Sequence, residues 1–188
     1  IGFDAVISAG EKFPAVTFNY LSNTLKLVSR FGVGTDEIDI IAATKNGVAV
    51  CNAAGSLSTA VAECAIGMII NLLREFPARE QAVRNNDWSW FFEGKNSHQI
   101  EGKTIGLIGF GDIAKALAKM LMGFDCRVLA YDKHWDDQAA KLLHVERSDI
   151  AAIQREADII SLHVPVTSET CDMVDMDFLN AMKRNAVL

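Results

Sequence analysis

The chain has no run of basic residues and no long apolar segment. Its 188 residues include 18 Lys and Arg against 24 Asp and Glu, which gives a formal net charge of −6. Without a basic patch there is no electrostatic footprint for nucleic acid or for an anionic membrane, so we expect neither as a partner. The longest apolar stretch, residues 59–73, is interrupted by Glu63 and Asn71 and is too short to span a bilayer. We expect it to be a buried helix.

Metal-binding and redox patterns of cysteine are also missing. The cysteines stand far apart with no C-x-x-C spacing, and no histidine joins them in a metal-ligand pattern. We therefore expect no metal site. We interpret the cysteines as buried free thiols in a reducing, cytoplasmic compartment. They are Cys51, Cys64, Cys126 and Cys171.

The most informative feature that is present is a glycine turn between two apolar strands. Residues 104–108 form a strand pattern that runs into Gly109 and Gly111, and a helical pattern follows. The next strand pattern, residues 128–131, ends in Asp132, roughly 20 residues after the turn. Gly109 permits a tight turn, Gly111 lets the backbone approach a pyrophosphate, and the helix start offers N–H groups to phosphates. This order indicates a dinucleotide-binding unit in which Asp132 binds ribose hydroxyls.

Two residues of the turn depart from the simplest pattern. Ala114 stands in the place of the third glycine, which the fingerprint allows because a methyl group still permits close packing of helix and strand. Asp112 lies in the first turn of the helix, where a carboxylate suits the helix dipole but repels a pyrophosphate. Two interpretations stay open: Asp112 is an N-cap residue, or it weakens cofactor affinity.

Strand and helix patterns alternate along the whole chain, which predicts an α/β protein with parallel sheets. The first region has strand patterns and a long helix, and a crossing segment at residues 84–103 precedes the second region. The aromatic residues of this segment are either an exposed shelf for a ligand or, as is more usual beside a linker, part of a domain interface; they are Trp88, Trp90, Phe91 and Phe92. The first-region strands are residues 5–8, 25–29 and 48–51, and the helix is 58–74. Beyond the turn we expect helices at 136–143, 150–155 and 176–182 and strands at 157–162 and 186–188.

Four separate segments resemble one family, the D-isomer-specific 2-hydroxyacid dehydrogenases. They are residues 25–39, Ala62-Glu63, residues 102–111 and residues 157–165 with Thr170. Within the family the chain is most similar to the phosphoglycerate dehydrogenase branch and to hydroxypyruvate and glyoxylate reductases. The resemblance implies a Rossmann-type doubly wound parallel sheet plus a smaller flavodoxin-like α/β substrate domain. We expect residues 1–90 to be the substrate domain and 91–188 the NAD-binding domain, both incomplete because the chain is truncated at both ends.

The resemblance implies a substrate loop made by Arg30, Gly32, Val33 and Gly34. A turn flanked by glycines can aim successive backbone N–H groups at the substrate carboxylate. Taken without the other motifs, the same residues would be a tight turn after a strand. Arg30 either helps to hold an acidic substrate or is a solvated side chain at the strand end.

The resemblance also implies the residues that line the cofactor. Gly109, Gly111, Asp112 and Ile113 would contact the pyrophosphate, Asp132 the ribose, and His163, Val164, Pro165 and Thr170 the adenosine side of the cleft. Taken alone, His163 would be a strand-end histidine with its hydrogen bonds satisfied. Asp132 favours NAD over NADP because a carboxylate repels a 2′-phosphate, although Lys133 and His134 could soften that preference.

The implied activity is hydride transfer between NAD and the 2-carbon of a small 2-hydroxy or 2-oxo acid. The family's catalytic arginine, carboxylate and histidine would lie beyond the strand that starts at Ala186, so we name no catalytic residue. Two other functions stay open: an NAD-sensing, corepressor-like binding module, and an inactive remnant. Asp112, Leu57 and Ala60 point weakly to the remnant.

The expected partner, besides the substrate, is a second copy of the chain. Relatives pair through the long helix and the nucleotide domain, so the resemblance implies a homodimer. The apolar side chains of the long helix suit either this contact or core packing. They are Val61, Ala65, Met68, Ile69 and Leu72.

Overall fold

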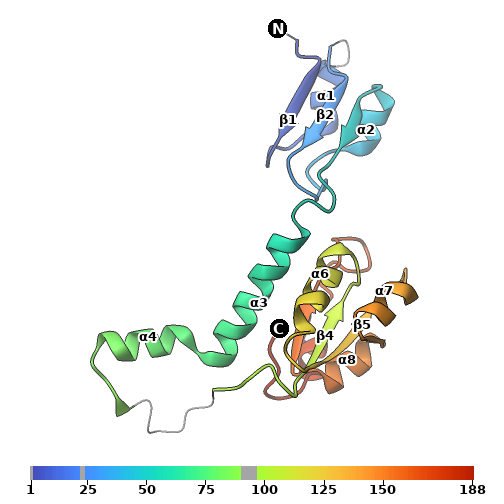
Figure 1. Cartoon of the computed structure of the whole chain (residues 1–188). Helices are drawn as coiled ribbons and strands as arrows, with labels where there is room; N and C mark the ends of the chain where they lie inside the picture. The colour runs from blue at the N-terminus through green and yellow to red at the C-terminus, as the bar shows by residue number, and fades with distance from the viewer. Residues whose placement is uncertain (1, 22–23, 90–96) are drawn as a thin grey trace. The chain divides into compact units, whose positions relative to one another are not determined.

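The computed structural model describes residues 2–21, 24–89 and 97–188. The chain divides into two compact units, Ile1–Leu57 and Ser58–Leu188 (Figure 1). Each unit is built on its own parallel sheet. The predicted α/β class is therefore confirmed, and the two units are described separately.

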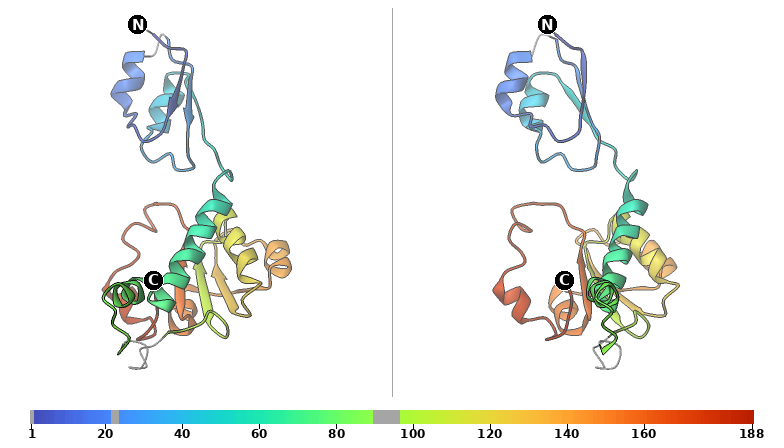
Figure 2. Two further views of the ribbon diagram at one scale, coloured as in Figure 1. Left: turned by 60° about the vertical axis from the view of Figure 1, so that its left-hand side comes forward. Right: turned by 90° about the vertical axis from the view of Figure 1, so that its left-hand side faces the viewer.

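The first unit is a three-stranded parallel sheet with two helices. Its strands are β1 (Ala5–Ser8), β2 (Leu27–Arg30) and β3 (Ala49–Cys51), in the order β1-β2-β3. The connecting helices, α1 (Ala15–Leu21) and α2 (Ile40–Lys45), lie on the same side of this sheet (Figure 2). Each new strand is added on the same edge of the sheet, and right-handed crossovers between such strands place both helices on one face.

Strand alternation decides which side chains of this sheet are packed. Val6, Val28 and Val50 are aligned in neighbouring strands and belong to the apolar cluster formed with the two helices. The neighbouring Ile7 points to the opposite face, where it is 80 % exposed. The sheet of this unit therefore has one face covered by its own helices.

The second unit is a four-stranded parallel sheet in the order β6-β5-β4-β7. The strands are β4 (Thr104–Ile108), β5 (Arg127–Tyr131), β6 (Val145–Arg147) and β7 (Ile159–Leu162). The helices are α3 (Ser58–Arg74), α4 (Phe76–Arg84), α6 (Asp112–Leu121), α7 (Asp137–Leu142), α8 (Ile150–Glu156) and α9 (Met176–Asn180). Strands are added on both sides of β4, which is the predicted doubly wound arrangement.

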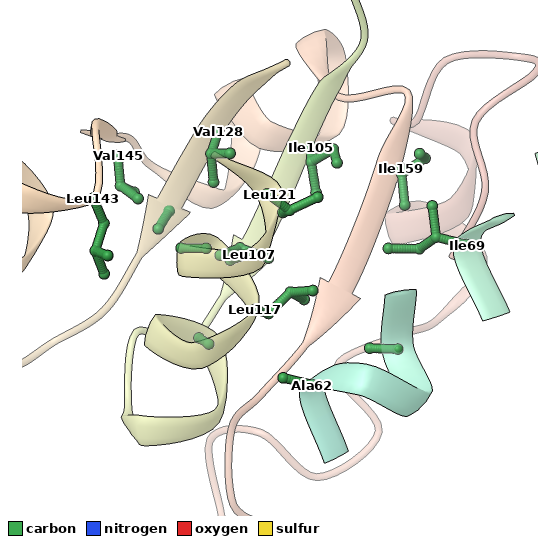
Figure 3. Close-up of a cluster of buried hydrophobic side chains, with 14 of the residues drawn as sticks. Ala62, Ile69, Ile105, Leu107, Leu117, Leu121, Val128, Leu143, Val145 and Ile159 are labelled. Atoms are coloured by element: carbon green, nitrogen blue, oxygen red, sulfur yellow. The ribbon is translucent and has the colours of Figure 1, made fainter. Parts of the chain in front are cut away.

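Apolar clusters cover both faces of this sheet. On one face, Leu117 of α6 and Ala62 and Ile69 of α3 pack against Ile105 and Leu107 of β4 (Figure 3). The opposite face carries a second cluster, which consists of Ile108, Leu129, Ile153, Ala157, Ile160 and Phe178. Helices on both faces explain why the strands are apolar on both sides.

Gly106 allows α8 to approach the second face closely. A Cβ atom at Gly106 would lie 2.3 Å from Cγ2 of Ile153 and 3.2 Å from Cβ of Ala157. Any side chain at this position would push α8 away from the sheet. This glycine therefore serves packing, in contrast to the glycines of the turn that follows.

The predicted domain boundary at residue 90 differs from the division between Leu57 and Ser58. Helix α3 has the predicted bounds, but its buried side chains join the apolar cluster of the second unit. They are Ala62, Ala65, Ile69 and Leu73, spaced so that they fall on one helix face. Packing places this helix with the second unit, although the linker-like composition begins only after α4.

The prediction of buried thiols is wrong. All four cysteines are free, but Cys51, Cys64 and Cys171 are exposed and Cys126 is half-buried. Cys64 lies on the outward side of α3 because the inward positions belong to the alanines on either side of it. Hydrophobic character alone did not show which face each cysteine occupies.

The C-terminal residues form less of a strand than their pattern predicts. Residues 186–188 contribute a single bridge from Val187 to Ile159, in place of a full strand. Trp88 is 55 % exposed, while Trp90, Phe91 and Phe92 lie outside the described residues. Within the described ranges, no helix has both the length and the apolar character needed to cross a membrane.

Candidate functional site

The predicted cofactor residues gather at one edge of the four-stranded sheet. Gly109 follows β4, Asp132 follows β5 and His163 follows β7. The strands are parallel, so their carboxyl ends meet at this edge. β4 lies between β5 and β7, where the strand order reverses, and open α/β sheets bind ligands at such a point.

Gly109 makes a turn that no other residue could make without strain. Its φ is +98°, and its N–H donates to the carbonyl of Tyr131 at 2.8 Å. A Cβ atom here would lie 2.5 Å from the backbone oxygen of His163. Conformation and close backbone contact thus both require glycine.

Gly111 differs, because the space around it is open. It is the N-cap residue of α6, and a Cβ atom there would meet nothing within 4 Å. The N–H groups of Gly111, Asp112 and Ile113 donate to no acceptor in the described part of the chain. Open space in front of unpaired amides at a helix start suits the oxygens of a pyrophosphate.

The interpretation of Asp112 as the N-cap is wrong. Gly111 occupies the cap position, and no side chain caps this helix. Asp112 is the first helical residue and is exposed, so its carboxylate still interacts favourably with the helix dipole. Its proposed effect on cofactor affinity stays a prediction.

The carboxylate of Asp132 is held by backbone donors on both oxygens. Oδ2 accepts the N–H of Phe110 at 2.6 Å, and Oδ1 accepts the N–H of His134 at 2.7 Å. Because Phe110 lies between the two glycines, the first bond ties the acid to the turn. Each oxygen keeps a further acceptor site, so the carboxylate remains able to accept ribose hydroxyls.

His163 is not the satisfied strand-end histidine that its position alone suggested. Its backbone N–H donates to Ile108 at 2.7 Å, but its Nε2 is buried and has no hydrogen-bond partner among the described residues. Burial lowers the pKa of its imidazole, which favours the neutral form. A buried polar atom left unpaired costs about 1–3 kcal/mol, so a ligand or water that bonds Nε2 would recover stability.

The loop after β7 forms an apolar hollow of about 270 Å³. Val164, Pro165 and Thr170 all line it, as the resemblance implied for the adenosine side. The Thr170 hydroxyl donates to the carbonyl of Pro165 at 2.5 Å and accepts the N–H of Thr167 at 2.8 Å. Thr170 therefore also holds the loop in shape, and apolar walls with few polar groups are typical of a site for a flat ring.

Lys133 has a partner that the sequence did not reveal. Its ammonium group pairs with the carboxylate of Glu169, in the loop after β7. His134 contributes its backbone N–H to Asp132. The positive charge expected to soften the NAD preference at Lys133 is therefore already paired.

A second hollow, of about 460 Å³, is lined in part by Asp132. Its lining consists of Tyr131, Asp132, Arg147, Ser148 and Asp149. Sequence reasoning missed the last three residues. Their signal was present: they end and follow β6, the strand beside β5, and so reach the same edge of the sheet.

The predicted substrate loop follows β2 in the first unit. Gly32 has a φ of +144°. Arg30 donates from Nε to the carbonyl of Gly34 at 3.1 Å and from Nη1 to the carbonyl of Ala9. Arg30 is therefore not a free solvated side chain, because it connects two loops.

Two further bonds hold the carbonyl groups of the substrate loop. The Asn52 amide donates to the Val33 carbonyl at 2.7 Å, and the Ala53 N–H donates to the Gly32 carbonyl at 2.9 Å. The N–H groups of Val33 and Gly34 donate to no acceptor within the described ranges. Fixed carbonyls and adjacent unpaired amides are suited to an anion such as a carboxylate. Sequence reasoning missed the contribution of Asn52.

The second unit fits a dinucleotide. Unpaired amides at the start of α6 suit the pyrophosphate, Asp132 suits ribose hydroxyls, and the apolar hollow suits a base. Among the described residues, no group of three or more His, Cys, Asp or Glu side chains is arranged to hold a metal ion.

Comparisons with known proteins agree with this geometry. The chain is 37 % identical over 171 residues to the glyoxylate reductase of Thermofilum pendens, which covers 87 % of this chain and 49 % of that protein. It is 34 % identical over 167 residues to the D-3-phosphoglycerate dehydrogenase of Methanocaldococcus jannaschii, which covers 87 % of this chain and 31 % of that protein. The chain thus spans about half the length, or less, of these curated relatives.

Solved structures of NAD-dependent dehydrogenases also match this chain. The NAD-dependent formate dehydrogenase of Staphylococcus aureus, in complex with NAD, superimposes with a TM-score of 0.85 and 28 % identity, over 98 % of this chain and 56 % of that one. Residues 66–188, well over half of the chain, match the family described as D-isomer specific 2-hydroxyacid dehydrogenase, NAD binding domain. This match includes the glycine turn and Asp132, and it makes NAD the cofactor. The chain therefore belongs to the D-isomer specific 2-hydroxyacid dehydrogenases and carries their NAD-binding domain.

Proposed function

We propose that the protein is an NAD-dependent oxidoreductase of the phosphoglycerate dehydrogenase type. It transfers hydride between C4 of the nicotinamide and C2 of a small D-2-hydroxy or 2-oxo acid. The first unit binds the substrate carboxylate, and the second unit binds NAD. Relatives named glyoxylate reductase and D-3-phosphoglycerate dehydrogenase support this substrate class.

The observation that carries the proposal is the pair of unpaired amides at Val33 and Gly34. Arg30 and Asn52 hold the neighbouring carbonyl groups, so these amides are held ready for an anion. A substrate carboxylate bound there would accept two N–H donors without any side-chain rearrangement. A binding site that is organised in advance loses less entropy when the ligand arrives.

In this mechanism the chain's own residues bind and orient NAD and the substrate. NAD supplies the hydride acceptor or donor when it is bound. The amides of Gly111, Asp112 and Ile113 bind its pyrophosphate, and Asp132 fixes a ribose. Reduction of a 2-oxo acid needs one proton besides the hydride. We assign this proton to none of the four histidines, because none occupies the place of the family's catalytic histidine.

Two measurements on the same sample test this function. NADH binding is followed by its fluorescence, and NADH oxidation by absorbance with glyoxylate, hydroxypyruvate and pyruvate. We expect NADH to bind, and we expect oxidation with at least one of the acids when the sample also contains the arginine, carboxylate and histidine expected beyond Ala186. In such a sample, tight binding of NADH without oxidation of any acid would favour the NAD-sensing module. A folded chain that does not bind millimolar NADH would contradict the proposal and favour the inactive remnant.

We further propose that the protein is cytoplasmic and forms a homodimer. The free cysteines support a reducing compartment. Of the apolar residues on α3, Ala65 and Ile69 are buried in the core, while Met68 and Leu72 are each 55 % exposed. Val61 is also exposed, so this side of α3 supports a contact with a second copy. Light scattering should give twice the 20.5 kDa of one chain, and a value of 20.5 kDa would contradict the dimer.

A further inference from the structure

Arg147 places a positive charge in the hollow beside Asp132. It is the last residue of β6, it is exposed, and it lines the hollow of about 460 Å³ with Asp132, Ser148 and Asp149. Within the described ranges, no carboxylate lies within ion-pair distance of its guanidinium group. A guanidinium group bonds carboxylate or phosphate oxygens in a bidentate manner, so the unpaired Arg147 is available to such an anion.

An aromatic stack keeps Arg147 in this position. Its guanidinium carbon lies 5.6 Å from the centre of the Trp135 indole, which is the geometry of a cation–π contact. Trp135 in turn stacks on Phe110, with ring centres 5.1 Å apart and planes 23° apart. Phe110 is 2 % exposed and lies between the two glycines of the phosphate turn. The stack therefore links the position of Arg147 to the turn itself.

The neighbouring charges are already engaged. The ammonium groups of Lys115 and Lys133 pair with Asp136 and Glu169. The carboxylate of Asp132 accepts two backbone N–H groups, as described above. Asp149 is the N-cap of α8 and accepts the N–H of Ala152 at 2.7 Å. Arg147 is thus the cation of this hollow whose N–H donors are available to an incoming anion, because no ion pair competes for them.

We propose that Arg147 forms a subsite for a phosphate group on the adenosine ribose, so that this chain takes NADP as well as NAD. The inference rests on the proposed cofactor site, in which Asp132 holds that ribose. A 2′-phosphate would enter the hollow that Arg147 lines, where the guanidinium offsets the repulsion from Asp132. An arginine near the ribose is the general means by which this fold accommodates a 2′-phosphate.

The test uses two probes that differ by one phosphate group, 5′-ADP and 2′,5′-ADP. Calorimetry in a phosphate-free buffer gives the dissociation constant of each probe for the full 188-residue chain and for the variant Arg147→Gln. Arg155→Gln is the matched control, because this substitution removes the same charge. Arg155 is exposed on α8 and does not line the hollow. A thermal melt of each variant shows that it is folded.

We expect the wild type to bind both probes with dissociation constants within about tenfold of each other, because the charge-assisted bond to Arg147 offsets repulsion. Arg147→Gln should raise the dissociation constant of 2′,5′-ADP at least about tenfold and change that of 5′-ADP by no more than about twofold. Arg155→Gln should change neither. If Arg147→Gln weakens both probes equally, or neither, the phosphate subsite is wrong while the NAD site stands. If neither 5′-ADP nor NADH binds to the folded wild type, the cofactor site itself is wrong, and the subsite with it.

Discussion

The two candidate anion-binding loops of this chain are built in different ways. In the second unit, the turn at Gly109 is held mainly by backbone: the Gly109 N–H donates to the Tyr131 carbonyl, and a Cβ atom would collide with the His163 carbonyl. One side chain contributes as well, because Asp132 accepts the N–H of Phe110. In the first unit, the loop at Gly32 and Gly34 is held largely by side chains, since Arg30 and Asn52 bond its carbonyl groups.

The two loops therefore tolerate different substitutions. A loop held by backbone contacts fails when a glycine gains a side chain, and it is insensitive to most side-chain changes. A loop held by side chains loses its shape when one polar group is removed, while the unit around it stays folded. We therefore expect the first kind of change to affect stability and NAD binding together, and the second to affect substrate binding alone.

The largest effect is expected from Gly109→Ala. The substitution combines a φ of +98° with a Cβ atom 2.5 Å from a backbone oxygen, so we expect a loss of about 3 kcal/mol or more in unfolding free energy. NADH binding should be lost. Trp88 and Trp135 lie in the second unit, so tryptophan fluorescence in urea reports its unfolding.

Gly47→Ala is the matched control for this change. Gly47 has a φ of +70°, but a Cβ atom there would meet nothing within 4 Å. Circular dichroism in urea should show a loss of about 1 kcal/mol from backbone strain alone. Equal losses for the two variants would show that the contact with His163 contributes nothing.

The next largest effect is expected from Asp132→Ala. It removes the acceptor for the ribose hydroxyls and for the N–H groups of Phe110 and His134, so the dissociation constant of NADH should rise about tenfold or more. NADPH should be affected less, because a repelling charge is also removed. Fluorescence titration with both cofactors measures this. Asp177→Ala, an exposed acid of α9, is the control, and unchanged affinities for both cofactors would contradict the assignment of Asp132.

Arg30→Gln should act on the substrate alone. It removes donors that hold Gly34 and Ala9, so the dissociation constant of the 2-oxo acid should rise about tenfold while the affinity for NADH stays unchanged. Lys26→Gln, which breaks an exposed ion pair with Asp4 in the same unit, should change neither quantity. A loss of NADH affinity in Arg30→Gln would show that the two loops are not independent.

Local spacing was enough to predict the centre of the cofactor site. Gly109, Gly111 and Asp132 are separated by one strand, one helix and one more strand, and each of these has a recognisable period. The bounds of β4 and α3 match the prediction for the same reason, since both have a regular apolar pattern. Residues that follow one another along the chain are the ones a sequence pattern locates best.

Features that depend on neighbours across the sheet were missed. Arg147 enters the site because β6 lies beside β5, and strand order is set by packing. Gly106 faces Ile153 of α8, which packs on the sheet, and no local signal shows that contact. Asp112 was interpreted as a cap because its residue type favours caps, but Gly111 takes that position. Each miss concerns which face or partner a residue meets in space.

The smallest effect, and the sharpest test of backbone against side-chain control, is expected from Asp112→Asn. Asp112 is exposed at the start of α6, so its charge repels a pyrophosphate bound by the neighbouring amides. NADH should bind a few-fold more tightly to the variant, and the gain should shrink as salt rises, because screening acts over about 10 Å at 0.1 M. The helix should lose about 0.3–1 kcal/mol of dipole stabilisation. Asp177→Asn removes an acid from the first turn of α9 and should give a comparable loss of stability without any gain in affinity. Tighter binding that is independent of salt would mean that Asp112 acts through the shape of the turn, and the backbone of this loop would then be less self-sufficient than its contacts indicate.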